Sequence, residues 1–145
     1  MITEVEAYDG ERDQACHARA GRTARTDVLY GPGGFWYVYL CYGIHEMLNL
    51  VVGPAGWPAA VLVRGVEGIR GPGRVTKQLG IDRRLNAAPA APVSGLWLED
   101  RGVVLPRKAI EITPRIGVDY AGEVWSMKPW RFVHADATAA KRRND

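Results

Sequence analysis

Apolar and polar positions alternate along the first residues of the chain. A strand over residues 2–8 places Glu4, Glu6 and Tyr8 on one face and their apolar neighbours on the other, because side chains of an extended chain point to opposite sides in turn. Two carboxylates and an aromatic ring are therefore expected to share one side of this strand.

Further strands are indicated by runs of β-branched and aromatic residues that lie between Gly- and Pro-containing turns. We expect them at residues 35–42, 47–52, 59–66, 96–99, 103–105 and 109–113, with residues 130–134 closing the sheet. The helical segments are expected to be short, with a helical turn within residues 11–20 and a helix over residues 74–79. For the strands up to residue 66, the most economical arrangement is an antiparallel meander.

The length of 145 residues fits one domain with one hydrophobic core. Hydrophobic residues (47%) and charged residues (24%) occur in globular proportions, and no apolar run approaches the ~20 residues that span a bilayer. The first residues carry no features of a signal peptide. These observations predict a soluble, cytoplasmic protein whose two cysteines, Cys16 and Cys41, remain thiols.

The charge of the chain is compatible with nucleic-acid binding. The net charge is +3 and the pI is near 9.0, and 15 Arg stand against 4 Lys. A guanidinium donates two parallel hydrogen bonds to a phosphate, although an excess of Ala, Gly, Pro and Arg can equally reflect genome base composition. Charge alone leaves both explanations open. Arg12, Arg19, Arg22 and Arg25 crowd one loop region, and residues 141–143 form a frayed basic tail.

Glu6 is the first candidate for chemistry. Hydrolysis of a glycosidic bond needs a carboxylate that orients water and balances the positive charge developing on the sugar. From the pattern alone, a half-buried strand glutamate paired with an arginine is the more frequent situation. Nearby phenols shift the balance, because Tyr37 and Tyr39 share a strand face and Tyr42 lies at a turn from which it could project as a wedge. An ordinary aromatic core is the competing interpretation.

Metal and covalent chemistry are not indicated. The best-spaced pair of potential metal ligands, Cys41 and His45, lies in a strand-and-turn sequence, and His17 and His134 complete no recognisable metal spacing. Neither cysteine and no serine lies in a nucleophile-elbow sequence, and phosphate-loop signatures are absent. The sequence therefore predicts neither a metal site nor a covalent nucleophile.

A series of short blocks, spread over nearly the whole chain, carries the most specific signal. The first are Ile2-Thr-Glu-Val-Glu-Ala-Tyr8, His17 with Gly21-Arg22-Thr23, and Tyr37-Val-Tyr-Leu-Cys-Tyr-Gly43 with Asn49. The later ones are Val61-Leu-Val-Arg64, Gly71-Pro-Gly-Arg74, Gln78-Leu-Gly-Ile81, Arg115-Ile-Gly-Val118, Ala121-Gly122 and Lys128-Pro-Trp-Arg-Phe132. Together, in this order and spacing, they resemble the alkyladenine (3-methyladenine) DNA glycosylase family.

The resemblance implies an α+β fold, a single mixed domain over residues 1–145 around a curved antiparallel sheet with short peripheral helices. It further implies a monomeric, monofunctional enzyme without cofactor or metal. Such an enzyme flips alkylated or deaminated purines out of duplex DNA and hydrolyses the N-glycosidic bond, the first step of base excision repair. By the same resemblance, Glu6 activates the attacking water and Arg64 helps to hold Glu6.

The resemblance also assigns the base-binding residues. Tyr8, His17 and Tyr39 would sandwich the flipped base, and Tyr42 would fill the gap left in the duplex. Asn49 would crowd the exocyclic amino group of normal guanine. Further contacts with DNA are expected from Arg22, Arg25, Tyr37 and Arg74.

Two features depart from the family pattern. The family has a helix and a strand ahead of the Glu-Ala-Tyr block, whereas Met1 lies almost at that block, and a missing lead-in would leave a sheet edge unpaired. The loop reads Thr23-Ala-Arg-Thr26 where the family has Thr-x-Arg-Asn, which puts one phosphate contact in question. These departures keep a second function open, a catalytically inactive nucleic-acid-binding module of the same fold.

Overall fold

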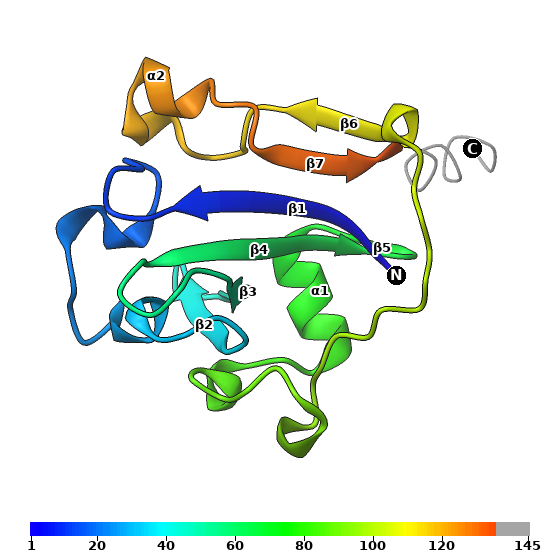
Figure 1. Ribbon diagram of the computed structural model, residues 1–145, viewed down its shortest axis with the longest axis horizontal. Coiled ribbons are helices and arrows are strands. Elements are labelled where there is room, and N and C mark those ends of the chain that lie inside the picture. The colour runs from blue at the N-terminus through cyan, green and yellow to red at the C-terminus, as the bar shows by residue number, and fades with distance from the viewer. Residues whose placement is uncertain (136–145) are drawn as a thin grey trace.

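A computed structural model of the chain describes residues 1–135. Its centre is a seven-stranded antiparallel sheet with the order β2-β3-β4-β1-β7-β6 and the short β5 beside β4 (Figure 1). The strands are β1 (Ile2–Asp9), β2 (Trp36–Cys41), β3 (His45–Val51), β4 (Ala59–Val66), β5 (Ile69–Arg70), β6 (Ile110–Thr113) and β7 (Arg131–His134). The described residues also form the helices α1 (Pro72–Leu79) and α2 (Glu123–Ser126) and several 3-10 turns. The predicted α+β fold class is confirmed.

The first strand of the chain lies inside the sheet. β1 pairs with β4 along its length and with β7 through residues 4–6. The predicted meander is right for β2, β3 and β4 and wrong for β1, which pairs with β4 instead of lying beside β2. β1 itself has a partner on each side.

Most of the predicted elements are confirmed to within two residues. Helix α1 begins earlier than expected, at Pro72, since proline is well suited to the first turn of a helix. The helical turn expected within residues 11–20 is limited to a 3-10 turn at His17–Ala20. The strands predicted at residues 96–99 and 103–105 are wrong, because no neighbouring strand pairs with them in the described chain. The basic tail at residues 141–143 lies outside the described residues.

The two faces of the sheet are covered by different parts of the chain. Helix α1 packs on β3 and β4, and its Val75 shares an apolar cluster with Trp36, Val38 and Leu48. We call this side the helix face. It contains none of the site residues that were predicted on β1, β2 and β3.

Loop residues cover the other side, which we call the loop face. Cys16, Ala18 and Leu29 pack there against Tyr37 and Val51 of the sheet. Strand register places the candidate site on this face, because β1, β2, β3 and β4 each turn alternate side chains toward it. The loop over residues 13–30 therefore closes one side of the site.

A buried ion pair fastens the loops over the loop face. The guanidinium of Arg115 donates to both carboxylate oxygens of Asp13, at 2.6 and 2.9 Å, and both side chains are fully buried. Arg115 also donates to the main-chain oxygen of Ala7, at 2.9 Å. One guanidinium thus joins β1 to two loops that are far apart in the sequence.

We expect Asp13→Asn to lower the free energy of unfolding by about 3–5 kcal/mol, because it leaves a buried guanidinium without its counter-charge. Asp27→Asn removes the exposed ion pair with Arg22 and should change that free energy by less than about 1 kcal/mol. Urea denaturation measures both changes. Equal effects of the two substitutions would show that the buried pair does not stabilise the fold.

Candidate active site

Glu6 lies fully buried in the middle of β1 on the loop face. One carboxylate oxygen accepts a hydrogen bond from the hydroxyl of Tyr8, at 2.8 Å, and the other accepts one from the main-chain N–H of Ile116, at 2.8 Å. The guanidinium of Arg64 lies 3.4 Å from the same carboxylate. Donors from two strands and a distant loop therefore hold this side chain in one orientation.

Glu4 is the residue that holds Arg64 in place. Arg64 donates to Glu4 at 2.9 Å, closer than its 3.4 Å approach to Glu6, and Arg131 of β7 donates to the same Glu4 oxygen at 2.7 Å. Burial raises the pKa of Glu4, but the hydrogen bonds and charges of Arg131 and Arg64 outweigh it and leave this pKa below its usual value. Alternation placed Glu4 beside Glu6, but no sequence pattern gave it this role.

A small aromatic cavity adjoins Tyr8, the hydrogen-bond partner of Glu6, while Glu6 itself does not line it. Its volume is about 40 Å³, and Tyr8, His17, Tyr39 and Asn49 are among the residues that line it. The structure thus brings together all four residues expected to bind the base. Tyr8 joins the two parts of the site, because its ring lines the cavity while its hydroxyl bonds to Glu6.

The aromatic cavity is too narrow for a base in this conformation. The ring of His17 meets Tyr39 edge-on with the ring centroids 4.4 Å apart, and its Nδ1 forms a 2.9 Å hydrogen bond with the hydroxyl of Tyr37. A space of this size holds about one water. A base stacked between two rings needs them about 7 Å apart, twice the contact distance of carbon atoms. A base could stack between His17 and Tyr39 only if the two rings moved apart.

Guanidinium groups lie over two of the aromatic rings. Arg25 lies 5.3 Å from the ring centre of Tyr39, and Arg115 lies 4.7 Å from that of Tyr8. Burial and the neighbouring Glu6 raise the pKa of Tyr8 well above its usual value. The Tyr8 phenol therefore keeps its proton and acts as a donor to the carboxylate.

Tyr42 lies apart from the cavity, at the turn between β2 and β3. Its side chain is 88% exposed, and its φ of 50° lies in the left-handed region that few residues other than glycine adopt. The turn is closed by a 3.2 Å hydrogen bond from Ile44 N–H to the oxygen of Cys41. The same hairpin that carries Tyr39 and Asn49 therefore presents an exposed ring at its tip.

The other residues expected to contact DNA do not form one surface, because two of them are exposed in different places and one is buried. Arg22 is exposed and pairs with Asp27 at 2.6 Å, and Arg74 is exposed on α1, in the layer on the helix face. Tyr37 is only 3% exposed and its hydroxyl is engaged by His17, so it forms a wall of the cavity rather than an accessible contact. Of the basic residues proposed, Arg25 alone adjoins the aromatic residues of the cavity.

Comparison with known proteins settles the family. A family model described as Methylpurine-DNA glycosylase matches residues 1–70 and 66–138. A relative from Psychrobacter cryohalolentis is 43% identical, over 98% of this chain and 77% of its own length. One from Myxococcus xanthus is 46% identical, over 94% of this chain and 73% of its own. Both are provisionally named 3-methyladenine DNA glycosylases. The chain belongs to the methylpurine-DNA glycosylase family.

Membership of this family fixes the general activity as that of a DNA glycosylase, a hydrolase of N-glycosyl bonds that acts in DNA repair. Within residues 1–135, no group of three or more His, Cys, Asp and Glu side chains is arranged to hold a metal ion. In the same part of the chain, no helix has the length and apolar character needed to cross a membrane.

Several residues of the candidate site were missed by sequence reasoning. The N–H of Ile116 bonds to Glu6, Arg115 lies over Tyr8, and the hydroxyl of Tyr120 donates to the oxygen of Ala15 at 2.9 Å on the cavity wall. All three come from one segment that lies more than a hundred residues after β1. Only the family resemblance marked this segment, and it assigned no role to it.

The pH dependence of stability should report the environment of His17. Burial, together with the charges of Arg25 and Arg19, lowers the pKa of His17 from 6.5 to about 4. Between these two values the unfolded chain binds the proton and the folded chain does not, so stability is lost as the pH falls from 6.5 toward 4.

We expect the wild-type protein to lose unfolding free energy between pH 6.5 and pH 4.5, and His17→Gln to lose less over the same interval. Urea denaturation at the two pH values measures both losses. The free energy of unfolding of each protein at pH 6.5 is the reference for its value at pH 4.5. If the two proteins show parallel pH profiles, His17 does not titrate in this range.

Proposed function

We propose that the protein flips an alkylated or deaminated purine out of duplex DNA and hydrolyses its N-glycosidic bond with water activated by Glu6. The observation that carries the proposal is the 2.8 Å hydrogen bond between Tyr8 and Glu6, because it couples a ring of the cavity to the buried carboxylate. In this proposal the protein acts as a cytoplasmic monomer.

Glu6 acts as the general base. An ionised carboxylate has about four acceptor positions; Tyr8 and Arg64 donate to one oxygen of Glu6 and Ile116 donates to the other, so acceptor capacity for a water molecule remains on the oxygen bonded to Ile116. The water attacks the anomeric carbon, its proton passes to the carboxylate, and the base leaves with the bonding electron pair of the glycosidic bond. The negative charge of Glu6 also stabilises the positive charge that develops on the sugar.

Water rather than an amine is the nucleophile in this proposal. A glycosylase that also cleaves the DNA strand needs an amine that attacks the sugar. No lysine is among the residues that line the cavity. The product is therefore a free base and an abasic site.

The cavity walls provide the selection for damaged purines. A purine made cationic by alkylation is attracted to the faces of Tyr8 and Tyr39, and its glycosidic bond is already weakened. The amide of Asn49 donates to the main-chain oxygens of Tyr37 and Met47, at 3.2 and 3.4 Å, which fixes its position in the cavity wall. Held in this way, Asn49 would clash with the extra amino group of guanine.

Glu6→Gln should reduce base release by roughly 100-fold or more, because the amide cannot accept the proton of the attacking water. The substrates are duplexes that contain one hypoxanthine or one ethenoadenine, and free base and alkali-labile sites are measured. Affinity for the same duplexes should stay unchanged, as measured by fluorescence anisotropy.

A variant that still turns over would remove Glu6 from the mechanism. Wild-type protein that binds these duplexes and releases no base would instead favour the inactive nucleic-acid-binding module. Trapping of a protein–DNA adduct with borohydride would show an amine nucleophile in place of water.

We expect the ring of Tyr42 to speed base release from base-paired lesions and to have no effect on release from unpaired ones. Tyr42→Asn keeps a residue that tolerates a positive φ while removing the ring, so we expect normal stability but roughly tenfold or more slower base release from duplex DNA. Tyr42→Phe is the matched control that keeps the ring. Equal rates of Tyr42→Asn and wild type on the duplex would exclude a wedge at this position, as would an equal loss on single-stranded substrate.

A further inference from the structure

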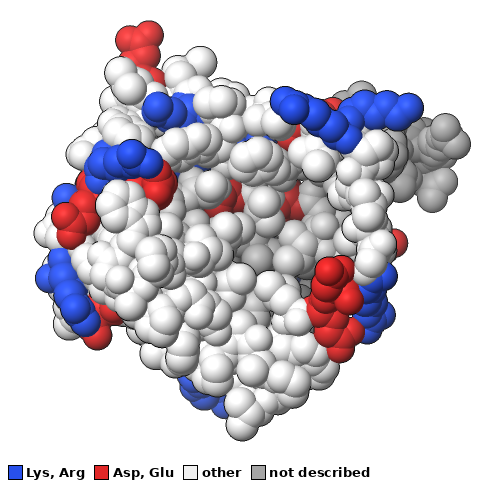
Figure 2. Space-filling model, in the orientation of Figure 1, with Lys and Arg blue, Asp and Glu red and all other residues white. Residues whose placement is uncertain are grey.

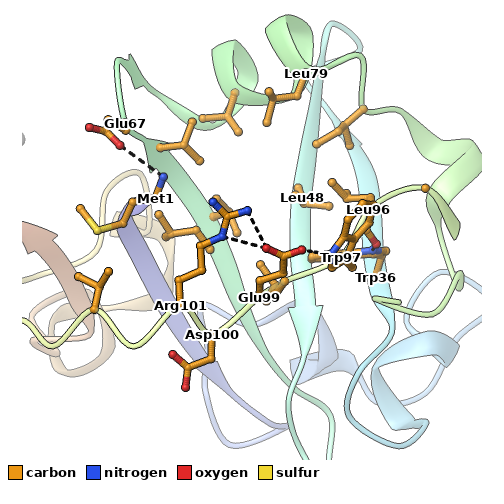
Figure 3. A pocket seen from close by; sticks show the side chains of 18 of the residues that line it. Met1, Trp36, Leu48, Glu67, Leu79, Leu96, Trp97, Glu99, Asp100 and Arg101 are labelled. Carbon is orange, nitrogen blue, oxygen red and sulfur yellow. Dashed lines mark hydrogen bonds and ion pairs between the residues drawn. The ribbon is translucent and has the colours of Figure 1, made fainter. Parts of the chain in front are cut away.

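Two cavities of the protein differ in the charges at their edges. The larger one lies on the helix face and is lined mainly by apolar side chains (Figure 3). Each positive group at its edge is paired, because Arg101 lies 2.7 Å from Glu99 and the amino group of Met1 lies 3.7 Å from Glu67. Basic side chains next to acidic ones are also visible elsewhere on the surface in Figure 2. This larger cavity therefore offers no uncompensated positive charge to an anion.

The aromatic cavity has two guanidinium groups without a counter-charge at its exposed end. Tyr120 marks this end, which we call the mouth, because it is 60% exposed while all other residues that line the cavity are buried or partly buried. Arg19 lies 5.0 Å from the ring centre of Tyr120, and Arg25 lies over Tyr39. No ion pair within residues 1–135 includes either arginine.

Arg19 is the arginine of this pair for which sequence reasoning gave no role. It is exposed, and its one hydrogen bond within the described residues goes to the main-chain oxygen of Gln14 at 3.4 Å. A guanidinium has five N–H donors, so most of those of Arg19 remain available to a ligand. The charges of Arg19 and Arg25 also contribute to the lowered pKa of His17, which shows that both act on the cavity.

The position of Arg19 is fixed by its neighbours. Its backbone belongs to the 3-10 turn His17–Ala20, which also supplies His17 to the cavity wall. The ring under its guanidinium is held as well, because the hydroxyl of Tyr120 donates to the main-chain oxygen of Ala15 at 2.9 Å. A guanidinium stacked on a fixed ring keeps its edge free to donate hydrogen bonds.

A nucleotide whose base enters the aromatic cavity brings an anion to this mouth. The flipped base stays attached to the DNA backbone, so its sugar and the adjoining phosphates remain outside the space that holds the base. A guanidinium binds a phosphate through two parallel hydrogen bonds, and such contacts fix the register of a protein on DNA. The mouth of the cavity therefore has the chemistry that a backbone phosphate requires.

We propose that Arg19, stacked on Tyr120, binds a backbone phosphate that adjoins the flipped nucleotide. The inference rests on the proposed function, because it assumes that the base enters the aromatic cavity. Arg19 binds the substrate and takes no part in breaking the glycosidic bond. Since Arg19 and His17 share one turn, the phosphate contact also fixes the position of a wall of the cavity.

The salt dependence of DNA binding tests this contact. The probe is a duplex with one ethenoadenine on a 2′-fluoro sugar, whose electron withdrawal opposes the positive charge needed for base release during the measurement. We expect Arg19→Gln to weaken binding about tenfold at low salt and to reduce the slope of log K against log salt by about one. Arg12→Gln is the matched control, because Arg12 also lies over a ring, that of Trp57, but is paired with Asp9.

Neutral phosphate analogues locate the contact. Methylphosphonate groups replace, one at a time, the phosphates on the two sides of the lesion. At the phosphate bound by Arg19, the replacement should weaken wild type and Arg12→Gln about tenfold and Arg19→Gln hardly at all, because both changes remove the same interaction. Arg19→Lys keeps the charge without the bidentate geometry, so it should retain the salt slope of wild type and only part of the affinity.

The proposal is overturned if Arg19→Gln keeps the affinity and salt slope of wild type, or if it loses affinity with an unchanged slope, which would indicate a structural role. It is also overturned if every methylphosphonate weakens Arg19→Gln as much as wild type. Base release from a hypoxanthine duplex separates this result from the proposed function. Release by wild type with no slope change in Arg19→Gln rejects the phosphate contact alone, whereas no release with the expected slope change rejects the catalytic proposal alone.

Discussion

Glu4 and Glu6 are buried close together on one face of β1, and a buried carboxylate is costly unless its partners are in place. The partners come from every neighbour that β1 has. β4 supplies Arg64, β7 supplies Arg131, and the segment before α2 supplies the N–H of Ile116. The sheet order with β1 between β4 and β7 is therefore a requirement of the site, because another order would leave one of these charges without its counter-charge.

The β2–β3 hairpin forms a wall of the aromatic cavity, next to these buried charged residues. Its strands turn Tyr39 and Asn49 toward the cavity, while its tip exposes Tyr42 to solvent. The wall of the cavity and the exposed ring are thus parts of one rigid element, so a displacement of the hairpin moves both together. His17 contacts Tyr39 edge-on in the cavity wall and, unlike Tyr39, stands on a 3-10 turn outside the sheet.

Local patterns were enough to predict most strands, the α+β class and the shared face of Glu4, Glu6 and Tyr8, because side-chain alternation is a property of the strand itself. They could not give the position of β1 in the sheet, which depends on pairing with residues more than fifty positions away. The strands predicted at residues 96–99 and 103–105 had the right composition, yet a strand also needs a neighbour. Burial of Tyr37 and the role of Ile116 were beyond local patterns for the same reason. The grouping of the residues expected to bind the base was available only through the family resemblance.

The central position of β1 has a consequence for how the protein is made. β1 is synthesised before both of its partners, because β4 follows some fifty residues later and β7 begins at Arg131. Contacts between positions so far apart close slowly, because a long loop must first be ordered. Glu4 and Glu6 therefore leave the ribosome as solvated, unpaired charges, and the carboxylate pair can become enclosed only after translation has passed β7.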